Sequence, residues 1–328
     1  MRASSLLMCL AIATAAMTAQ TTQLRLVSTA WPPFTNAAGQ PRFALDLVEA
    51  GLGRIGVKSE TTIVDDGQLT SLLLSGKFDG SAAVWKDAER ERTLLFSQPY
   101  LENRLILVGR RGTDVSATAL SSLKGKRIAI VEGYAYGETI DTSGATFVRT
   151  KTEEDSLKQL LDSAVDYTLM DELVIQYIVS HYAEEARTRL QVGSTPLVTR
   201  QLHLAVRRSV PDAESIVSRF NDQLRGMIAD HTYHRLLHVD WIRADVDGDG
   251  LAEYVPQSDR AGAREPTRAY SLFATEPSVM STPKTQQRYL FGGSVYDGWT
   301  TVPDKFKVDD PQRPDPNRST AVIFRFAW

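Results

Sequence analysis

Short apolar segments alternate with amphipathic helical segments over the first third of this chain, and this alternation restricts the fold more than any other feature. A strand–helix–strand succession of this kind is typical of an α/β protein with a mostly parallel sheet. It runs from Thr21 to about Arg111. The expected segments, strand and helix in turn, are Leu24–Val27, Leu45–Ile55, Thr62–Val64 and Leu69–Leu74.

A second α/β unit follows a break at Arg110–Gly112. The pattern then predicts a return to the first unit, because a strand and a long helix follow residues 191–195. Two lobes joined by two crossings would form a hinge with a ligand cleft between them. The expected segments are the strand Ile128–Val131, helices at Glu153–Ser163 and Glu172–His181, the strand Leu202–Val206 and the helix Asp212–His231.

The division of the chain follows from these segments. Lobe 1 is expected to comprise residues 20–110 and 195–242, and lobe 2 residues 111–194. Residues 243–328 are expected to form a C-terminal extension of β or partly irregular structure.

Residues 1–19 have the pattern of a secretory signal peptide. One arginine precedes a short apolar run that closes in small residues, with cleavage expected after Ala15 or Ala19. Cys9, the only cysteine, lies inside this run after Met8, which is not the small residue that lipidation requires. We therefore expect a periplasmic protein without disulfides or cysteine metal sites.

Composition removes several other classes of protein. A chain of 328 residues with 42% hydrophobic content can bury two modest cores. The net charge of −3 gives no reason to expect a nucleic-acid partner, and five scattered histidines make no zinc pattern. We expect a monomer that requires no cofactor.

The most specific motif lies in Leu72–Val108, where Phe96-Ser97-Gln98-Pro99-Tyr100 follows Arg90. This order resembles the first lobe of bacterial extracellular solute-binding proteins of family 3, which deliver polar amino acids to ABC importers. The resemblance implies the α/β two-lobed periplasmic-binding-protein fold, with a hinge and a cleft between the lobes. In that family an arginine six residues before the Phe clamps the ligand carboxylate, and Arg90 has this position. A guanidinium suits the role because its planar fork matches a carboxylate and keeps its charge. The alternative is an ordinary solvated arginine.

Aromatic residues accompany this motif. Trp31-Pro32-Pro33-Phe34 resembles the family's first loop, so the resemblance implies that Trp31 and Phe34 lie against the ligand. The alternative is that Trp31 caps the core. Trp85 stands where the family usually has a threonine or serine that helps to hold the α-ammonium. It either enlarges the aromatic wall or closes the site.

The second lobe supplies two further candidates. Gly133 and Tyr134 lie in a strand–helix turn, where free backbone amides bind carboxylates; the family has Thr or Ser at the position of Tyr134. Asp171 ends a segment that resembles the family's second-lobe strand, whose final acid receives the ligand ammonium. The alternative is that Asp171 caps the helix that begins at Glu172.

The resemblance implies an exported binding protein rather than an enzyme. It would capture a small polar ligand, an amino acid or related carboxylate, for an ABC importer with a permease at the inner membrane. One alternative is a periplasmic hydro-lyase of the same fold, similar to the dehydratases, with Glu132 or Glu172 as general acid. The other is a sensory or scavenging protein that meets no permease.

The C-terminal extension begins with a segment similar to a calcium loop, and we expect one Ca²⁺ there as the alternative to a plain turn. Pro256 replaces the bidentate glutamate of an EF-hand, so only a shortened loop is compatible. A last strand is expected at Thr320–Trp328. The expected calcium ligands are Asp245, Asp247, Asp249, the Leu251 carbonyl and Glu253.

Overall fold

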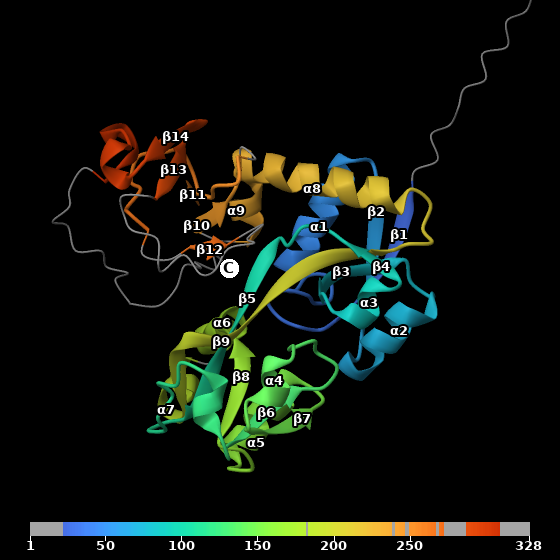
Figure 1. Ribbon diagram of the computed structural model, residues 1–328, viewed down its shortest axis with the longest axis vertical. Helices are drawn as coiled ribbons and strands as arrows, with labels where there is room; N and C mark the ends of the chain where they lie inside the picture. Colours follow the sequence, from blue (N-terminus) through green and yellow to red (C-terminus); the bar gives the residue numbers. More distant parts are fainter. Residues whose placement is uncertain are drawn as a thin grey trace, which may run out of the picture.

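The computed structural model describes residues 22–181, 183–237, 240–246, 249–266, 269–271 and 287–308. The expected signal peptide and the expected strand at Thr320–Trp328 lie outside these residues. Figure 1 shows two lobes, with a small separate sheet beside the first of them.

Lobe 1 is built on strands β1, β2 and β3, with helices on the sheet. β1 pairs in parallel with β2 over its whole length and also with β3. α1 packs on this sheet because its apolar positions recur on one face, from Phe43 through Leu47 to Leu52. The elements are β1 (Gln23–Thr29), α1 (Phe43–Arg54), β2 (Lys58–Val64), α2 (Leu69–Ser75), β3 (Gly80–Trp85), α3 (Ala88–Glu91) and β4 (Leu94–Phe96).

Lobe 2 repeats the strand–helix arrangement on a smaller scale. β6 lies between β7 and β8 and is parallel to both. Thr152 caps α5 by accepting a hydrogen bond from the backbone N–H of Asp155 at 3.0 Å. The elements are β6 (Arg127–Val131), α4 (Thr139–Thr142), β7 (Thr146–Thr150), α5 (Glu153–Leu161), β8 (Tyr167–Asp171), α6 (Glu172–His181) and α7 (Ala183–Arg189).

Two long strands connect the lobes. β5 (Leu101–Arg110) and β9 (Leu190–Arg207) are antiparallel and run through both lobes as the centre of one sheet. The strand order is β2-β1-β3-β9-β5-β8-β6-β7, with β4 also paired to β9. The sheet is therefore mixed rather than mostly parallel, since β3, β4 and β8 all pair antiparallel to these two strands.

The chain returns to lobe 1 as two helices where one was expected. α8 (Ala213–Ala229) and α9 (Thr232–Leu237) are separated by Asp230 and His231, and the φ of 58° at His231 breaks the helical path. Phe220, Leu224 and Met227 of α8 are fully buried in the core that continues through both lobes.

The extension has its own sheet and its own aromatic core. The sheet order is β12-β10-β11-β13-β14, and the core contains Tyr289, Phe291 and Phe306. The extension is tied to the hinge, because Nη2 of Arg104 on β5 donates to the Ala269 carbonyl at 2.7 Å. The strands are β10 (Trp241–Ala244), β11 (Glu253–Pro256), β12 (Tyr270–Ser271), β13 (Arg288–Phe291) and β14 (Ser294–Asp297).

The contact between β3 and β9 leaves no space for a side chain at Gly80. A Cβ placed there would lie 1.9 Å from the backbone oxygen of Ala205. We expect Gly80→Ala to lower the free energy of unfolding by about 1–3 kcal/mol, because the two strands must separate. Gly53→Ala is the control, since a Cβ at this helical position meets open space. It should raise stability by about 0.5–1 kcal/mol. Urea unfolding of both variants checks this, and equal midpoints would contradict it.

Candidate functional site

A pocket opens between the two lobes and contains about 440 Å³ that no atom fills, including the space at its mouth. Its walls come from the ends of β1 and β3, from β9, from α2 and α3, and from the turns after β1 and β6. The lining residues are Ser28, Thr29, Trp31, Leu69, Ala83, Val84, Trp85, Arg90, Gly133, Tyr134, Ala135 and Leu202.

Arg90 lies in this pocket because a short capped helix directs it inward. Asp87, in extended conformation, caps α3 by accepting a hydrogen bond from the Arg90 backbone N–H at 2.8 Å. The Arg90 guanidinium donates from Nη1 to the Trp85 carbonyl at 3.0 Å, and from Nη2 to Thr70 Oγ1 at 3.0 Å. Its position is therefore fixed by residues of lobe 1.

The charge of Arg90 is only partly compensated. The residue is 4% exposed, and its carboxylate partner Asp87 lies at 3.3 Å from Nη1 at the rim. Nε is buried and has no hydrogen-bond partner among the described residues. Burial lowers the pKa of Arg90, while the charges of Asp87 and Glu89 act in the opposite direction. A buried cation with a free donor favours an anionic ligand.

Three aromatic rings form the apolar part of the pocket. The ring centroids of Trp31 and Trp85 are 5.7 Å apart, and Tyr134 of lobe 2 lies 5.5 Å from the first and 5.3 Å from the second. All three pairs meet edge to face, which is a favourable packing of aromatic rings. Trp85 Nε1 donates to Asn103 Oδ1 at 2.8 Å, so the Trp85 indole is held by the hinge strand β5.

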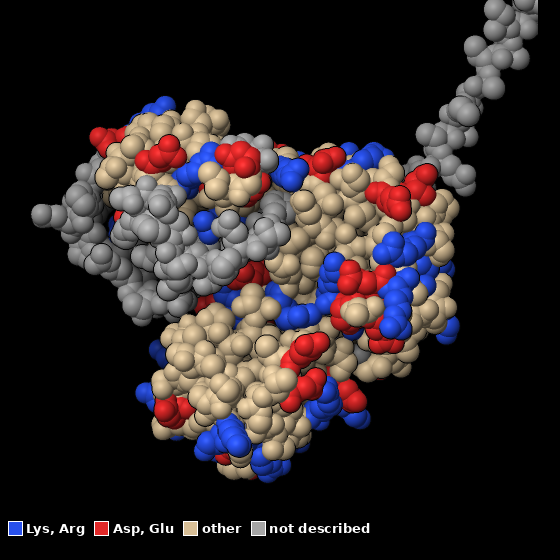
Figure 2. Space-filling view, in the orientation of Figure 1, with Lys and Arg blue, Asp and Glu red and all other residues tan. Residues whose placement is uncertain are grey.

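The lobes touch one another directly across the pocket. Arg90 Nη2 donates to the Gly133 carbonyl at 3.1 Å, and Trp31 Nε1 donates to Glu153 Oε1 at 2.9 Å. Figure 2 shows charged side chains of both signs along the boundary between the lobes. Both lobes therefore contribute to the polar contacts across the pocket.

Asp171 does not reach the pocket. It is fully buried where β8 ends, and its carboxylate accepts hydrogen bonds from Asn103 Nδ2, the Arg104 backbone N–H and the Leu173 backbone N–H, at 2.8–3.0 Å. The bond from Leu173 caps α6, which was the alternative interpretation of this residue. Asp171 therefore contacts the site only through Asn103 and Trp85.

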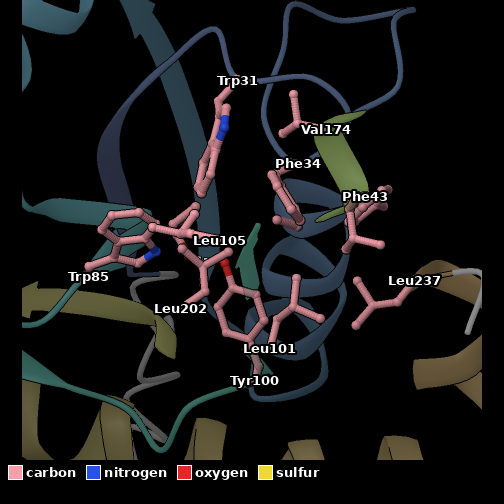
Figure 3. Packing of buried hydrophobic residues seen from close by; sticks show 14 of the residues in the cluster. Trp31, Phe34, Phe43, Trp85, Tyr100, Leu101, Leu105, Val174, Leu202 and Leu237 are labelled. Atoms are coloured by element: carbon pink, nitrogen blue, oxygen red, sulfur yellow. Dashed lines mark hydrogen bonds between the residues drawn. The ribbon is translucent and has the colours of Figure 1, made fainter. Parts of the chain in front are cut away.

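Phe34 also lies behind the pocket rather than in it. It is fully buried between Trp31 and Phe43, at centroid distances of 4.4 and 5.3 Å (Figure 3). The reason is geometric, because Trp31 and Phe34 belong to one tight turn in which the Phe34 N–H bonds to the Trp31 carbonyl at 2.8 Å. Only the first of the two aromatic side chains faces the cavity.

The pocket brings together five of the predicted site residues: Trp31, Trp85, Arg90, Gly133 and Tyr134. Sequence reasoning missed others that line it. Ser28 and Thr29 end a strand of the parallel part of the sheet, which is where such sheets bind ligands, so the predicted strand contained a usable signal. No sequence signal pointed to Leu202.

Two acids of the expected calcium loop, Asp249 and Glu253, are paired with an arginine. Arg288 Nη1 lies 2.7 Å from Asp249 Oδ2 and 3.0 Å from Oε1 of the fully buried Glu253. Asp245 accepts from the Gly250 N–H at 3.0 Å. Within the described ranges no group of three His, Cys, Asp or Glu residues could hold a metal ion. Asp247 lies outside those ranges, so calcium binding stays a prediction.

The described part of the chain has no helix that combines the length and apolar character needed to cross a membrane.

The two carboxylates considered for an enzyme are Glu132, which is exposed, and Glu172, which is half-buried. Neither of them lines the pocket.

Sequence comparison gives the family context. The sequence model of "Bacterial extracellular solute-binding proteins, family 3" matches residues 25–243, which include both lobes and the first residues of the extension. The ABC transporter arginine-binding protein 1 of Escherichia coli is 26% identical over 226 residues, or 64% of this chain and 86% of that protein. The virulence sensor protein BvgS of Bordetella pertussis is 25% identical over 185 residues, or 54% of this chain. The match spans only 15% of that sensor's length.

Structural comparison agrees with the two-lobed architecture. An ancestral arginine-binding protein bound to arginine superposes with a TM-score of 0.55 at 25% identity, covering 65% of this chain and 96% of that one. An arginine 3rd transport system periplasmic binding protein from Legionella pneumophila gives a TM-score of 0.55 at 21% identity, with 66% and 97% covered. The family and these structures are binding proteins.

Proposed function

Because this chain belongs to the bacterial extracellular solute-binding proteins of family 3, we propose that it is exported to the periplasm and captures a small carboxylate-bearing solute, an amino acid or related carboxylate, between its lobes. The observation that carries this proposal is the position of Arg90, which is buried in the interlobe pocket with a free Nε. A carboxylate there gains a charge-assisted hydrogen bond that water cannot make as well in a buried site.

Capture by closure of two lobes explains why both lobes contribute. Gly133 and Tyr134 reach the pocket from lobe 2, whereas Trp31, Trp85 and Arg90 belong to lobe 1. A ligand held by both sides stabilises the closed arrangement in proportion to its contacts with both. The hinge for this motion is the pair β5 and β9, the strands that run through both lobes.

Delivery to an ABC permease is the first candidate for the step after binding, supported by the likeness to an ABC transporter protein over 86% of its length. A sensory role is the second, supported by the likeness to a virulence sensor and by the extension that packs on the hinge strand through Arg104. Deleting the gene separates them. Loss of uptake of the bound solute supports the importer, while normal uptake with a lost response supports the sensor.

Ligand binding is expected to stabilise the mature protein and to change its tryptophan emission. At a hundredfold excess over the dissociation constant, binding adds about 2.7 kcal/mol, which raises the melting temperature of a chain this size by roughly 5 °C or more. Trp31 and Trp85 both line the pocket, so their fluorescence should change at the same concentrations. A thermal-shift screen of amino acids and small carboxylates, read together with tryptophan emission, measures both. A screen without any such shift or change would refute the proposal.

A further inference from the structure

Among the described residues, the lining of the pocket carries a single charge, and this charge is positive. Arg90 is the only charged side chain among the twelve described residues that line it. The remaining lining is mainly aromatic and aliphatic, with two small hydroxyls from Ser28 and Thr29 and the phenol of Tyr134. This distribution differs from what a zwitterion needs, because an α-ammonium brings three donors and a positive charge that require acceptors.

The carboxylate end of a ligand has a defined place. Nε and Nη2 share one edge of the Arg90 guanidinium; Nε is unpartnered among the described residues, and Nη2 donates to the Gly133 carbonyl at 3.1 Å. A carboxylate that takes both donors would form a bidentate pair and replace one of the two acceptors now on Nη2, the Gly133 carbonyl or Thr70 Oγ1.

The ammonium end has no corresponding place. Asp171 accepts three N–H donors and is separated from the cavity by Asn103 and Trp85. Glu153 accepts the Trp31 indole N–H at 2.9 Å and does not line the pocket. The rings of Trp31, Trp85 and Tyr134 touch one another at centroid distances of 5.3–5.7 Å, so they do not leave a separate cage for a cation among them.

We propose that this pocket selects a monocarboxylate with an apolar or aromatic body over the α-amino acid of the same skeleton. The inference rests on the proposed function, which gives the site a carboxylate ligand, and it narrows the class of that ligand. The carboxylate pairs with Arg90, and the body lies against Trp31, Trp85 and Leu202. An added α-ammonium would enter beside the Arg90 charge, and none of the described lining residues is an acid; Asp87, at the rim, is already paired with Arg90 at 3.3 Å.

Matched ligand pairs test the selectivity. Calorimetric titration of 3-phenylpropanoate against L-phenylalanine, and of 4-methylpentanoate against L-leucine, varies only the ammonium group. We expect each carboxylate to bind at least about tenfold more tightly than its amino acid, the cost of burying an unpaired charged donor. Equal or tighter binding of the amino acids overturns the inference but leaves the proposed function intact. Tighter binding of glycine betaine than of either carboxylate also overturns it, in favour of a cation site. If neither these compounds nor the wider amino acid set bind, the proposed function itself fails.

Asp171→Asn is the control for the alternative in which Asp171 accepts the ligand ammonium. If Asp171 received the ammonium, this variant would lose affinity for L-phenylalanine and keep its affinity for 3-phenylpropanoate. We expect the ratio of the two affinities to stay unchanged, because Asp171 lies behind Asn103. The ratio is independent of how much of the variant is folded. A fall in affinity confined to L-phenylalanine would contradict the inference.

Discussion

Arg90→Met is expected to weaken binding of the tightest ligand in the thermal-shift screen by about 30-fold to several thousand-fold. Truncating one partner of a desolvated charge pair costs about 2–5 kcal/mol, and each 1.4 kcal/mol is tenfold in affinity. Arg90 meets the condition of desolvation because it is 4% exposed. Methionine keeps much of the length of the side chain and removes its charge. Isothermal titration of the wild type and the variant measures the loss.

Arg92→Met is the matched control, since Arg92 lies two residues further along the chain and is exposed. The affinity of Arg92→Met for the same ligand should equal that of the wild type. Arg90→Lys retains the charge but loses the fork, so it should fall between Arg90→Met and the wild type. Melting temperatures show that each variant is folded. Wild-type affinity in a folded Arg90→Met protein would mean that Arg90 does not bind the ligand.

Ionisation of Asp171 is expected to lower the free energy of unfolding as the pH rises from about 4 to about 7. Burial raises the pKa of Asp171 to about 7 from its usual 3.8, although the N–H groups of Leu173 and Asn103 favour the ionised form. Between these values the folded protein binds a proton that the unfolded chain does not. Stability therefore falls as pH increases through this window and levels off above it. Three pKa units correspond to about 4 kcal/mol.

Urea unfolding of the wild type and Asp171→Asn at pH 5, 6, 7 and 8 tests this expectation. The amide cannot ionise, so the variant should lose the contribution of Asp171 to the pH dependence. The free energy of unfolding of the wild type minus that of Asp171→Asn should decrease by about 3 kcal/mol between pH 5 and pH 8. Asp162→Asn, which changes an exposed carboxylate of the same lobe, should follow the wild-type curve. Parallel curves for the wild type and Asp171→Asn would show that Asp171 is ionised throughout.

The periodicity of the sequence was sufficient for most elements of both lobes. The strand predicted at Leu24–Val27 lies in β1, and the helix predicted at Leu45–Ile55 overlaps α1. These segments carry their signal locally, in apolar residues at a spacing of two or of three to four. The direction of strand pairing was predicted less well. β5 and β9 are antiparallel because they carry the chain between the lobes in opposite senses, which no local pattern expresses.

Short motifs and local periodicity were enough to predict the family and the two-lobed architecture, and Arg90 lines the pocket between the lobes. They were not enough to tell which motif residues face the cavity, because that depends on packing between distant segments. Phe34 and Asp171 belong to motifs as good as that of Arg90, yet both are fully buried behind the pocket. For Asp171 the cause is the pairing of β5 with β8, which surrounds its carboxylate with donors from Asn103, Arg104 and Leu173 and keeps it out of the pocket.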